Sequence, residues 1–534
     1  MRKIPATMAT QHPDSASKYV PVTEEPDEAV FSFKNLGCEE YLVDYMSKLT
    51  PYHQVAWIIK KLVQETNLVL GRDVFITPRM VSGFREEPFR QLMTILSIME
   101  GIYNSLESYG DQGILEVVYG MIKAYEVPIK CKERVNDIFA LVKKELNLGL
   151  EGKELRIIPL YEGVPEQLSV REMVPDFISQ VGIKDYLRVF IGKSETALLY
   201  GHPASALSAK IAIADCYQVQ EESGVEIFPI FGGGALPFRG HITLENIDCV
   251  LEEYQGAKTY TVQSGMRYDH GPEKTVKLID RIKSASNKNF LEFDEDERRL
   301  IIQLITIFAK NYLLELSEIA EKVSKIATFI PNQRDRVLTS EQVAYYRDLK
   351  NVVPLANFCA DNEIRQTLLS LDQAKLQKLP RVIKFTAALY TCGMPPEFIG
   401  TGNAFKEIKE KLGQECLEKF LEEIYPLFKK DLKYASKFLN SNPNENLLLT
   451  SRILQSIENL KPYVQFEEPD SGYMILNQVA TTYIKNLLEG KKPDIWKLAI
   501  QIYPNEVAEY LNGSAQENLS KLILDMGKLR GSLG

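Results

Sequence analysis

One pattern repeats between residues 156 and 267: a short strand-like run ends in polar residues, and a helical pattern often follows. The runs are RIIPLYEG (156–163), LRVFIGKSE (187–195), VEIFPIFGGG (225–234) and KTYTVQSGMR (258–267). Alternating strands and helices indicate an α/β fold with a parallel sheet. In a (β/α)8 barrel the carboxyl ends of the strands share one mouth. That mouth would gather the polar residues that end these runs and the earlier run DVFITPR, namely Arg79, Glu162, Glu195, Arg239 and Arg267.

The rest of the chain is predicted to be mainly helical. Residues 27–70 and 84–150 carry apolar residues at helical spacing, and the pattern returns from about residue 296 to the end. At 534 residues, one barrel with large helical additions and two domains are both possible. We expect a single barrel-centred unit over 1–534, with a helix-rich insertion at about 84–150 and a helix-rich C-terminal part at about 296–534.

Composition limits the possible partners. The net charge is -9 and the acidic residues are spread along the chain, so we expect no binding to nucleic acid or to an anionic membrane. The seven cysteines form no CxxC pair, which favours a reducing, cytoplasmic location. The N-terminus lacks the apolar core of a secretory signal. Polar residues interrupt the most apolar segment, 300–316, which is predicted to be a buried helix.

Four of the five histidines, His12, His202, His241 and His270, lie in turns rich in glycine or proline. The turn IFPIFGGGALPFRGH is the most informative, because an apolar run ends in Gly232, Gly233 and Gly234 and then presents Arg239. Bare backbone NH groups beside a guanidinium indicate an anion site. The sequence therefore predicts an enzyme that handles phosphate.

Two carboxylates suggest a metal site. Glu162 and Glu195 end neighbouring strands, and carboxylates in such a pair suit a hard cation, Mg²⁺ or Mn²⁺. A solvated strand end is the alternative for each one alone. A nucleotide site is unsupported, because Leu187 and Pro237 stand where the phosphate-loop and dinucleotide patterns need glycine.

Other arginines are further candidates for anion binding. Arg334 and Arg336 lie in IPNQRDR, and Arg267 lies in GMRYDHG. Structural salt bridges to Asp335 and Asp269 are the alternative interpretation.

Five segments together resemble the short, archaeal-type phosphoenolpyruvate carboxylases. They are ATMATQHPD (6–14), IIPLYEG (157–163), GKSETALLYGH (192–202), FGGGALPFRGH (231–241) and the final LRGSLG. The resemblance implies a phosphoenolpyruvate/pyruvate-type (β/α)8 barrel with extensive additional α-helices and a homotetramer. It implies a carboxy-lyase that converts phosphoenolpyruvate and bicarbonate to oxaloacetate and phosphate with Mg²⁺ or Mn²⁺, through carboxyphosphate and a metal-bound enolate.

The same resemblance implies roles for individual residues. It places the catalytic histidine at His12 and the metal ligands at Glu162 and Glu195. It places the arginine that holds carboxyphosphate and CO2 at Arg239. The substrate-binding positions that it implies are Arg79, Gly232, Gly233, Gly234, Arg334 and Arg336.

The sequence also departs from the family pattern. Glu195 stands where we expect aspartate, and Leu198 replaces a lysine of the long-form enzymes. Their glycine-loop histidine and first arginine are replaced by Phe231 and Gly233. The chain ends in Gly-Ser-Leu-Gly after a predicted amphipathic helix over 519–530, for which Gly531 is a natural C-cap.

Two other functions are compatible with parts of the sequence. Another metal-dependent barrel enzyme acting on phosphoenolpyruvate or pyruvate, such as a lyase, would release no phosphate in response to bicarbonate. A non-catalytic helical scaffold is supported only by the helical second half and would not bind Mn²⁺.

Overall fold

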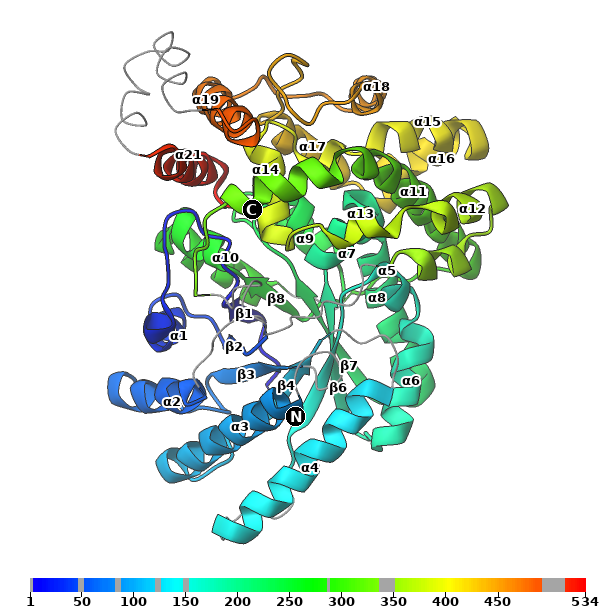
Figure 1. Ribbon diagram of the computed structural model, residues 1–534. Coiled ribbons are helices and arrows are strands. Elements are labelled where there is room, and N and C mark those ends of the chain that lie inside the picture. The colour runs from blue at the N-terminus through cyan, green and yellow to red at the C-terminus, as the bar shows by residue number, and fades with distance from the viewer. Residues whose placement is uncertain are drawn as a thin grey trace.

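In the computed structural model, eight parallel strands form a closed barrel in which β8 pairs with β1 (Figure 1). The strands are β1 (Thr7–Thr10), β2 (Glu40–Asp44), β3 (Phe75–Met80), β4 (Glu116–Tyr119), β5 (Arg156–Tyr161), β6 (Tyr186–Gly192), β7 (Glu226–Gly232) and β8 (Thr259–Val262). The structure describes residues 3–46, 52–81, 88–120, 126–146, 153–285, 289–335, 351–491 and 514–534. The predicted barrel is thus confirmed.

Five strands, β3 and β5 to β8, lie within or beside the runs identified in the sequence. The helical interpretation of 27–70 and 84–150 was wrong at β2 and β4, which interrupt those stretches. Both strands are short and wholly buried, and periodicity does not distinguish such runs from a buried helix. The helices within 84–150 therefore belong to the strand–helix alternation of the barrel itself.

The barrel interior is packed with side chains. One apolar cluster unites residues from six strands, namely Met8, Leu42, Val118, Ile158, Leu160, Phe190 and Ile230. Near the amino ends of the strands, buried Arg188 donates to Glu40 and Glu116 at 2.8 and 3.1 Å. Because the interior is filled, substrates can reach the barrel only at its ends.

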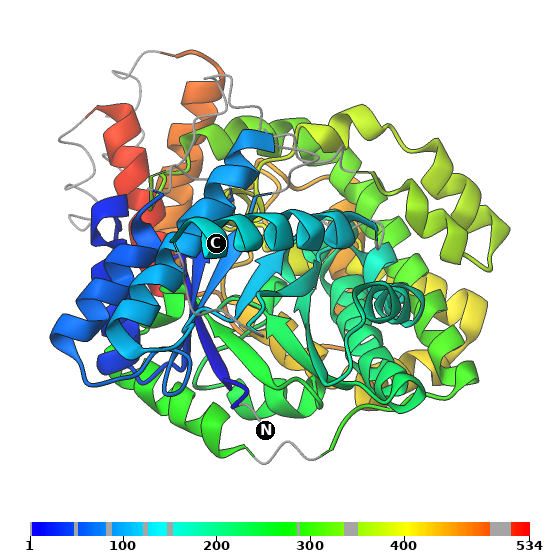
Figure 2. The same ribbon diagram turned by 90° about the horizontal axis from the view of Figure 1, so that it is seen from below.

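Helices surround the barrel, as Figure 2 shows from below. They are α1 (Glu25–Lys34), α2 (Gln54–Glu65), α3 (Pro88–Tyr109), α4 (Glu126–Leu146), α5 (Val164–Leu168), α6 (Val170–Val181), α7 (Ser194–Tyr200), α8 (His202–Ser223), α9 (Ile247–Glu253) and α10 (Pro272–Ser284).

The described residues after α10 are helical or irregular, and in Figure 1 they lie together on the upper side of the barrel. Their α-helices are α11 (Glu295–Ile326), α12 (Asn362–Ser370), α13 (Gln373–Gln377), α14 (Val382–Thr391), α15 (Thr401–Leu412), α16 (Gln414–Lys419), α17 (Phe428–Ser436), α18 (Ser451–Leu460), α19 (Ser471–Leu488) and α21 (Ala515–Arg530). Within the described ranges, one helix (Glu295–Phe329) is long and apolar enough to cross a membrane. Since 72% of its apolar window is buried inside the protein, it serves as a core helix, as predicted for 300–316.

Candidate active site at the carboxyl end of the barrel

The strand ends bring most of the predicted site residues to one end of the barrel. Arg79 lies near the end of β3, and Glu162 follows β5 directly. Glu195 lies in the first turn of α7, just after β6, and Arg239 ends the short helix η2 (Pro237–Arg239) that follows β7. His12 follows β1 by two residues. In a closed parallel barrel these positions all belong to the carboxyl-end mouth.

Arg239 is completely buried, and each of its guanidinium nitrogens has a partner. It donates to Gln263 Oε1 at 2.5 Å, to the main-chain oxygen of Gly534 at 2.6 Å, to Ser194 Oγ at 3.1 Å and to Asp14 Oδ2 at 3.4 Å. These partners come from the residue after β8, the last residue of the sequence, α7 and the turn after β1. The guanidinium therefore holds several strand ends together.

Electrostatics at Arg239 combine burial with two nearby carboxylates. Burial lowers the pKa of the Arg239 guanidinium below its usual value, and attraction to Asp14 and Glu195 opposes that shift. Burial likewise raises the pKa of Asp14 above its usual value, against the attraction of Arg239. The mouth therefore keeps a cation next to carboxylates with little water to screen it.

The glycines before Arg239 serve packing rather than anion binding through bare NH groups. The expectation of bare NH groups was wrong for two of them: Gly233 donates to Thr261 Oγ1 at 2.9 Å and Gly234 to the Arg239 oxygen at 2.8 Å. A Cβ on Gly233 would lie 2.8 Å from that same oxygen, and one on Gly232 would lie 2.4 Å from Phe190. The three glycines thus let the Arg239 turn fold tightly onto the barrel.

Arg79 connects two carboxylates at the mouth. Its Nε and Nη2 donate to the two oxygens of Asp44 at 3.0 and 2.8 Å, and its Nη1 lies 3.7 Å from Glu162 Oε1. Glu162 lies between two strand-end glycines, where a Cβ on Gly120 or Gly192 would come within 3.1 or 3.3 Å of its side chain. Glu162 is 21% exposed and can therefore meet a ligand from the mouth.

The residues present fit a hard divalent cation. Glu162 and the partly buried Glu195 follow neighbouring strands β5 and β6, and both offer carboxylate oxygens. No group of three or more His, Cys, Asp or Glu side chains able to hold a metal occurs within the described ranges. A cation held by these two carboxylates would keep positions for water and substrate, as Mg²⁺ commonly does.

The arm that carries His12 is tied to the end of β8. His12 Nδ1 lies 2.8 Å from Thr10 Oγ1, and the Thr10 carbonyl accepts from Arg267 at 2.6 Å. Two residues after the histidine, Asp14 accepts from the Gly265 NH at 2.9 Å. His12 therefore lies on an ordered turn, which contacts with Arg267 and Gly265 after β8 hold in place.

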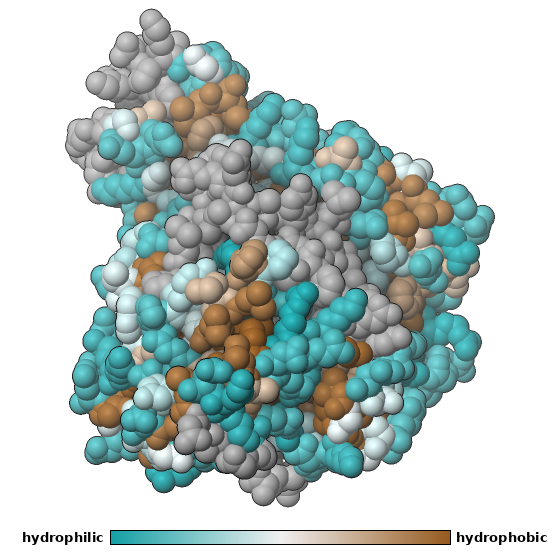
Figure 3. Space-filling view, turned by 60° about the horizontal axis from the view of Figure 1, so that its bottom comes forward, coloured by the Kyte–Doolittle hydropathy of each residue, from teal (hydrophilic) through white to brown (hydrophobic). Residues whose placement is uncertain are grey.

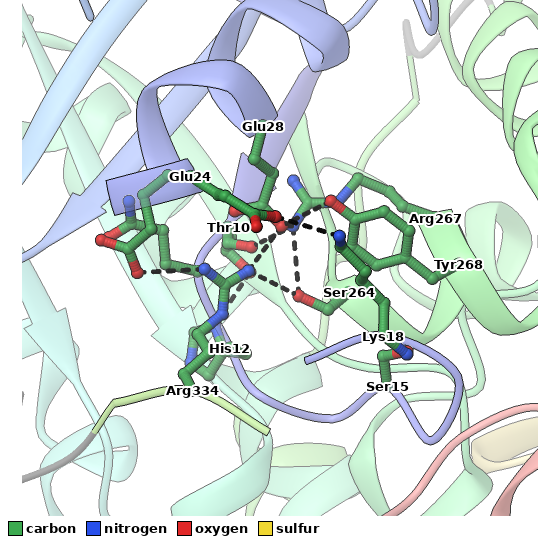
Figure 4. A network of polar contacts seen from close by, with 12 residues as sticks. Thr10, His12, Ser15, Lys18, Glu24, Glu28, Ser264, Arg267, Tyr268 and Arg334 are labelled. Atoms are coloured by element: carbon green, nitrogen blue, oxygen red, sulfur yellow. Dashed lines mark hydrogen bonds and ion pairs between the residues drawn. The ribbon is translucent and has the colours of Figure 1, made fainter. Parts of the chain in front are cut away.

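Arg334 is part of the ion-pair network behind this arm (Figure 4). It is 1% exposed and donates to Glu25 at 3.0 Å, to Glu28 and to Ser264 Oγ at 3.0 Å. Burial opposes ionisation of Glu28, but Arg267 and Arg334 lower its pKa to about 2. The contacts of Arg334 are thus those of a structural salt bridge, with Glu25 and Glu28 in place of the expected Asp335. Arg336 lies outside the described residues.

Arg267 is part of the same network rather than of the mouth. It donates to Glu28 at 2.9 Å as well as to Thr10. Asp269, its expected partner, instead accepts from Ser15 and from the NH of Ala16. Asp269 thus helps to hold the His12 arm in place.

The final residues lie in the mouth. Helix α21 ends at Arg530, and Gly531 caps it with φ 75°, as predicted, although the helix begins earlier than expected. Ser532 Oγ and the Leu533 NH donate to the Asp14 carbonyl at 2.9 and 2.7 Å. The tail is therefore ordered against the His12 arm and Arg239.

Sequence reasoning missed Asp14, Asp44 and Gln263. Asp14 belongs to the segment that carries His12, but nothing local marks it as a partner of Arg239. Asp44 ends β2, a strand that was not recognised, and Gln263 directly follows β8. A search for polar residues at every strand end would find Gln263, and it would find Asp44 only once β2 is recognised as a strand.

Comparison with known proteins gives a consistent result along the chain. A sequence profile of the family described as "Phosphoenolpyruvate carboxylase" matches residues 4–534. A protein of that name from Methanosarcina barkeri is 36% identical over 535 residues, covering 99% of both chains. One from Methanopyrus kandleri is 36% identical and covers 100% of this chain and 99% of its own. One from Methanothermobacter thermautotrophicus is 30% identical, with 88% and 93% covered.

Proposed function

The chain belongs to the phosphoenolpyruvate carboxylase family, and we propose that its barrel mouth is where phosphoenolpyruvate and bicarbonate react. The activity yields oxaloacetate and phosphate. The match over residues 4–534 carries the assignment of the reaction. Convergence of the residues on one barrel end supports the assignment of the site.

Charge is the first problem of this reaction. A bicarbonate oxygen must attack the phosphorus of an already anionic phosphoryl group. Arg79 and Arg239 offset that repulsion, since both are cations held at the mouth by carboxylates. The attack gives carboxyphosphate and the enolate of pyruvate, and Arg239 holds the carboxyphosphate.

A divalent cation, Mg²⁺ or Mn²⁺, would be held by Glu162 and Glu195. It would supply positive charge to the phosphoryl and enolate oxygens. Arg79 has the supporting role of orienting Glu162, because its Nη1 lies 3.7 Å from Oε1 while its other nitrogens are bound to Asp44.

His12 acts as the proton acceptor of the second step. Its Nδ1 is oriented by Thr10 Oγ1, so the ring is held at a fixed angle on its turn. It takes the carboxyl proton of carboxyphosphate, which then releases CO2 and phosphate. The enolate carbon attacks CO2 to form oxaloacetate, and Arg239 keeps CO2 in place while the site excludes water.

The assay for this proposal measures oxaloacetate formed from phosphoenolpyruvate, bicarbonate and Mg²⁺. We expect phosphate release to depend on bicarbonate and to match oxaloacetate in amount. Phosphate release that ignores bicarbonate would instead indicate a lyase or phosphatase, and absence of both products with intact folding would exclude catalysis. Arg239→Gln should abolish oxaloacetate formation if the mouth is the active site.

We also propose that the protein is a cytoplasmic homotetramer. None of its seven cysteines forms a disulfide, which agrees with a reducing compartment. Apolar patches lie on the side seen in Figure 3, and helices α2 and α3 expose Trp57, Phe89, Met93, Leu96 and Tyr103. A second copy of this chain would cover such a surface. Light scattering on the purified protein should give four subunits, and Phe89→Glu with Leu96→Glu should lower that number.

A further inference from the structure

The turn that carries Arg239 contains an unusual backbone conformation. His241 has φ 56°, and it is the only non-glycine residue with positive φ in the part of the chain that the structure describes. Such a conformation is unfavourable for a residue with a Cβ and persists only where surrounding contacts impose it. The contacts of His241 therefore show which parts of the protein hold the turn in this conformation.

The strongest contact of His241 comes from the C-terminal helical part. Its Nδ1 lies 2.6 Å from Asp431 Oδ1, on helix α17. Its side chain is 7% exposed, and its ring centroid lies 5.1 Å from that of Tyr434, one turn further along the same helix. Helix α17 thus holds the imidazole from outside the barrel.

Asp431 is itself fixed and charged. It is 1% exposed, and its Oδ2 lies 3.0 Å from His202 Nε2 and accepts from Tyr425 at 2.7 Å. Burial alone would raise the pKa of Asp431, but hydrogen bonds from His202 and His241 lower it below its usual value. A buried carboxylate with this set of partners has no freedom to move away from His241.

The backbone of the turn transmits this hold to Arg239. The Arg239 oxygen accepts from Gly234, and the Gly234 oxygen accepts from the NH of Ile242, the residue after His241. Phe238, the residue before Arg239, is also held by the C-terminal part, because its NH donates to Glu397 Oε1 at 2.8 Å. The guanidinium therefore sits on a loop that the C-terminal part holds on both sides of Arg239.

We propose that Asp431 is a positioning residue for carboxylation, which acts through His241 to hold the Arg239 turn in its active geometry. Neither side chain touches substrate. The inference rests on the proposed role of Arg239 at the mouth. Because Arg79 still offsets the charge repulsion of the first step, misplacement of Arg239 should affect phosphoryl transfer less than the retention of CO2, so more of the enolate is protonated to pyruvate.

The test uses Asp431→Asn, which keeps the volume but removes the charge, and His241→Gly, which permits positive φ but removes the imidazole. Both should lower kcat/KM for oxaloacetate at least tenfold and raise the ratio of pyruvate to oxaloacetate. The double variant should be within about threefold of the worse single variant, since the two residues act as one unit.

The matched control is Asp215→Asn. Asp215 is 2% exposed and pairs with Arg171 and Arg298 at 2.9 and 3.0 Å, away from the turn. It should lower the melting temperature without changing the product ratio. A parental product ratio in His241→Gly would overturn the proposal, even if Asp431→Asn did not fold. The proposal would also be overturned if the losses in kcat/KM of the two single variants multiplied in the double variant. Parental activity in Arg239→Gln would instead refute the role of Arg239.

Discussion

A single methyl group added to Gly534 tests whether the end of the chain organises the mouth. In Gly534→Ala the new Cβ would lie 2.2 Å from the Ile383 oxygen and 2.9 Å from the Ala387 nitrogen, on helix α14. Both are main-chain atoms of a buried helix and cannot move aside easily. We expect Gly534 to shift and to lose the 2.6 Å hydrogen bond from Arg239.

The size of the effect follows from the bond that is lost. A hydrogen bond to a charged group contributes about 1.5–3 kcal/mol. If that energy positions Arg239 in the transition state, turnover should fall roughly ten- to a hundredfold, at about 1.4 kcal/mol per tenfold. The melting temperature should change little, because Ser532 and Leu533 keep their bonds to Asp14.

The assay couples oxaloacetate to its reduction by NADH, with thermal unfolding measured in parallel. Gly472→Ala is the control, since its Cβ would meet only Asp470 at 3.5 Å, an ordinary contact. Deletion of residues 531–534 should lower turnover at least tenfold as well. Unchanged kcat/KM in both tail variants would refute a role for the tail in catalysis.

Variants at four further positions test the proposed roles and one buried carboxyl group. His12→Asn should lower the rate of oxaloacetate formation by ~10²–10⁴, because a proton acceptor is lost. The KM for phosphoenolpyruvate should stay within a few-fold of the parental value, since the other contacts remain. Steady-state kinetics measure both quantities, and near-normal turnover would remove His12 from the mechanism. Glu162→Gln should raise the Mg²⁺ concentration that gives the half-maximal rate, whereas Glu195→Asp should remain active. If Glu162→Gln and Glu195→Gln both kept the parental metal dependence, the metal site would be contradicted. Burial raises the pKa of Glu315 from 4.5 to about 7, so the free energy of unfolding should fall as pH rises across that interval. Glu315→Gln should flatten this dependence in melts at pH 5 and pH 8.

The barrel was predictable where strand ends are marked by polar residues. Runs such as RIIPLYEG end abruptly at a carboxylate, and each became a strand of the barrel. The strand EVVY carries no such mark and lies between two long amphipathic helices, so local sequence did not reveal it. What identifies it is pairing with β3 and β5, which is a property of the folded chain.

The sequence predicts the positions of the candidate residues at the strand ends, but it does not predict their partners. Strand order alone brings Glu162 and Arg239 to the mouth. The NH groups of Gly233 and Gly234, in contrast, find acceptors only when the turn closes on Thr261 and on Arg239 itself. Arg334 likewise pairs with Glu25, 309 positions away in the sequence, where the sequence suggested its neighbour Asp335.

The helical second half of the chain, which in the sequence was the only support for a non-catalytic scaffold, contributes directly to the mouth. Asp431 reaches the Arg239 turn through His241, and Gly534 accepts from Arg239 itself. Both contacts come from segments that the barrel alone would lack. A buried guanidinium needs hydrogen-bond partners to remain charged. Loss of the Gly534 contact would leave one Arg239 donor without that acceptor, and loss of the Asp431 contact would loosen the turn that carries Arg239. The C-terminal helices therefore complete the barrel chemically as well as structurally.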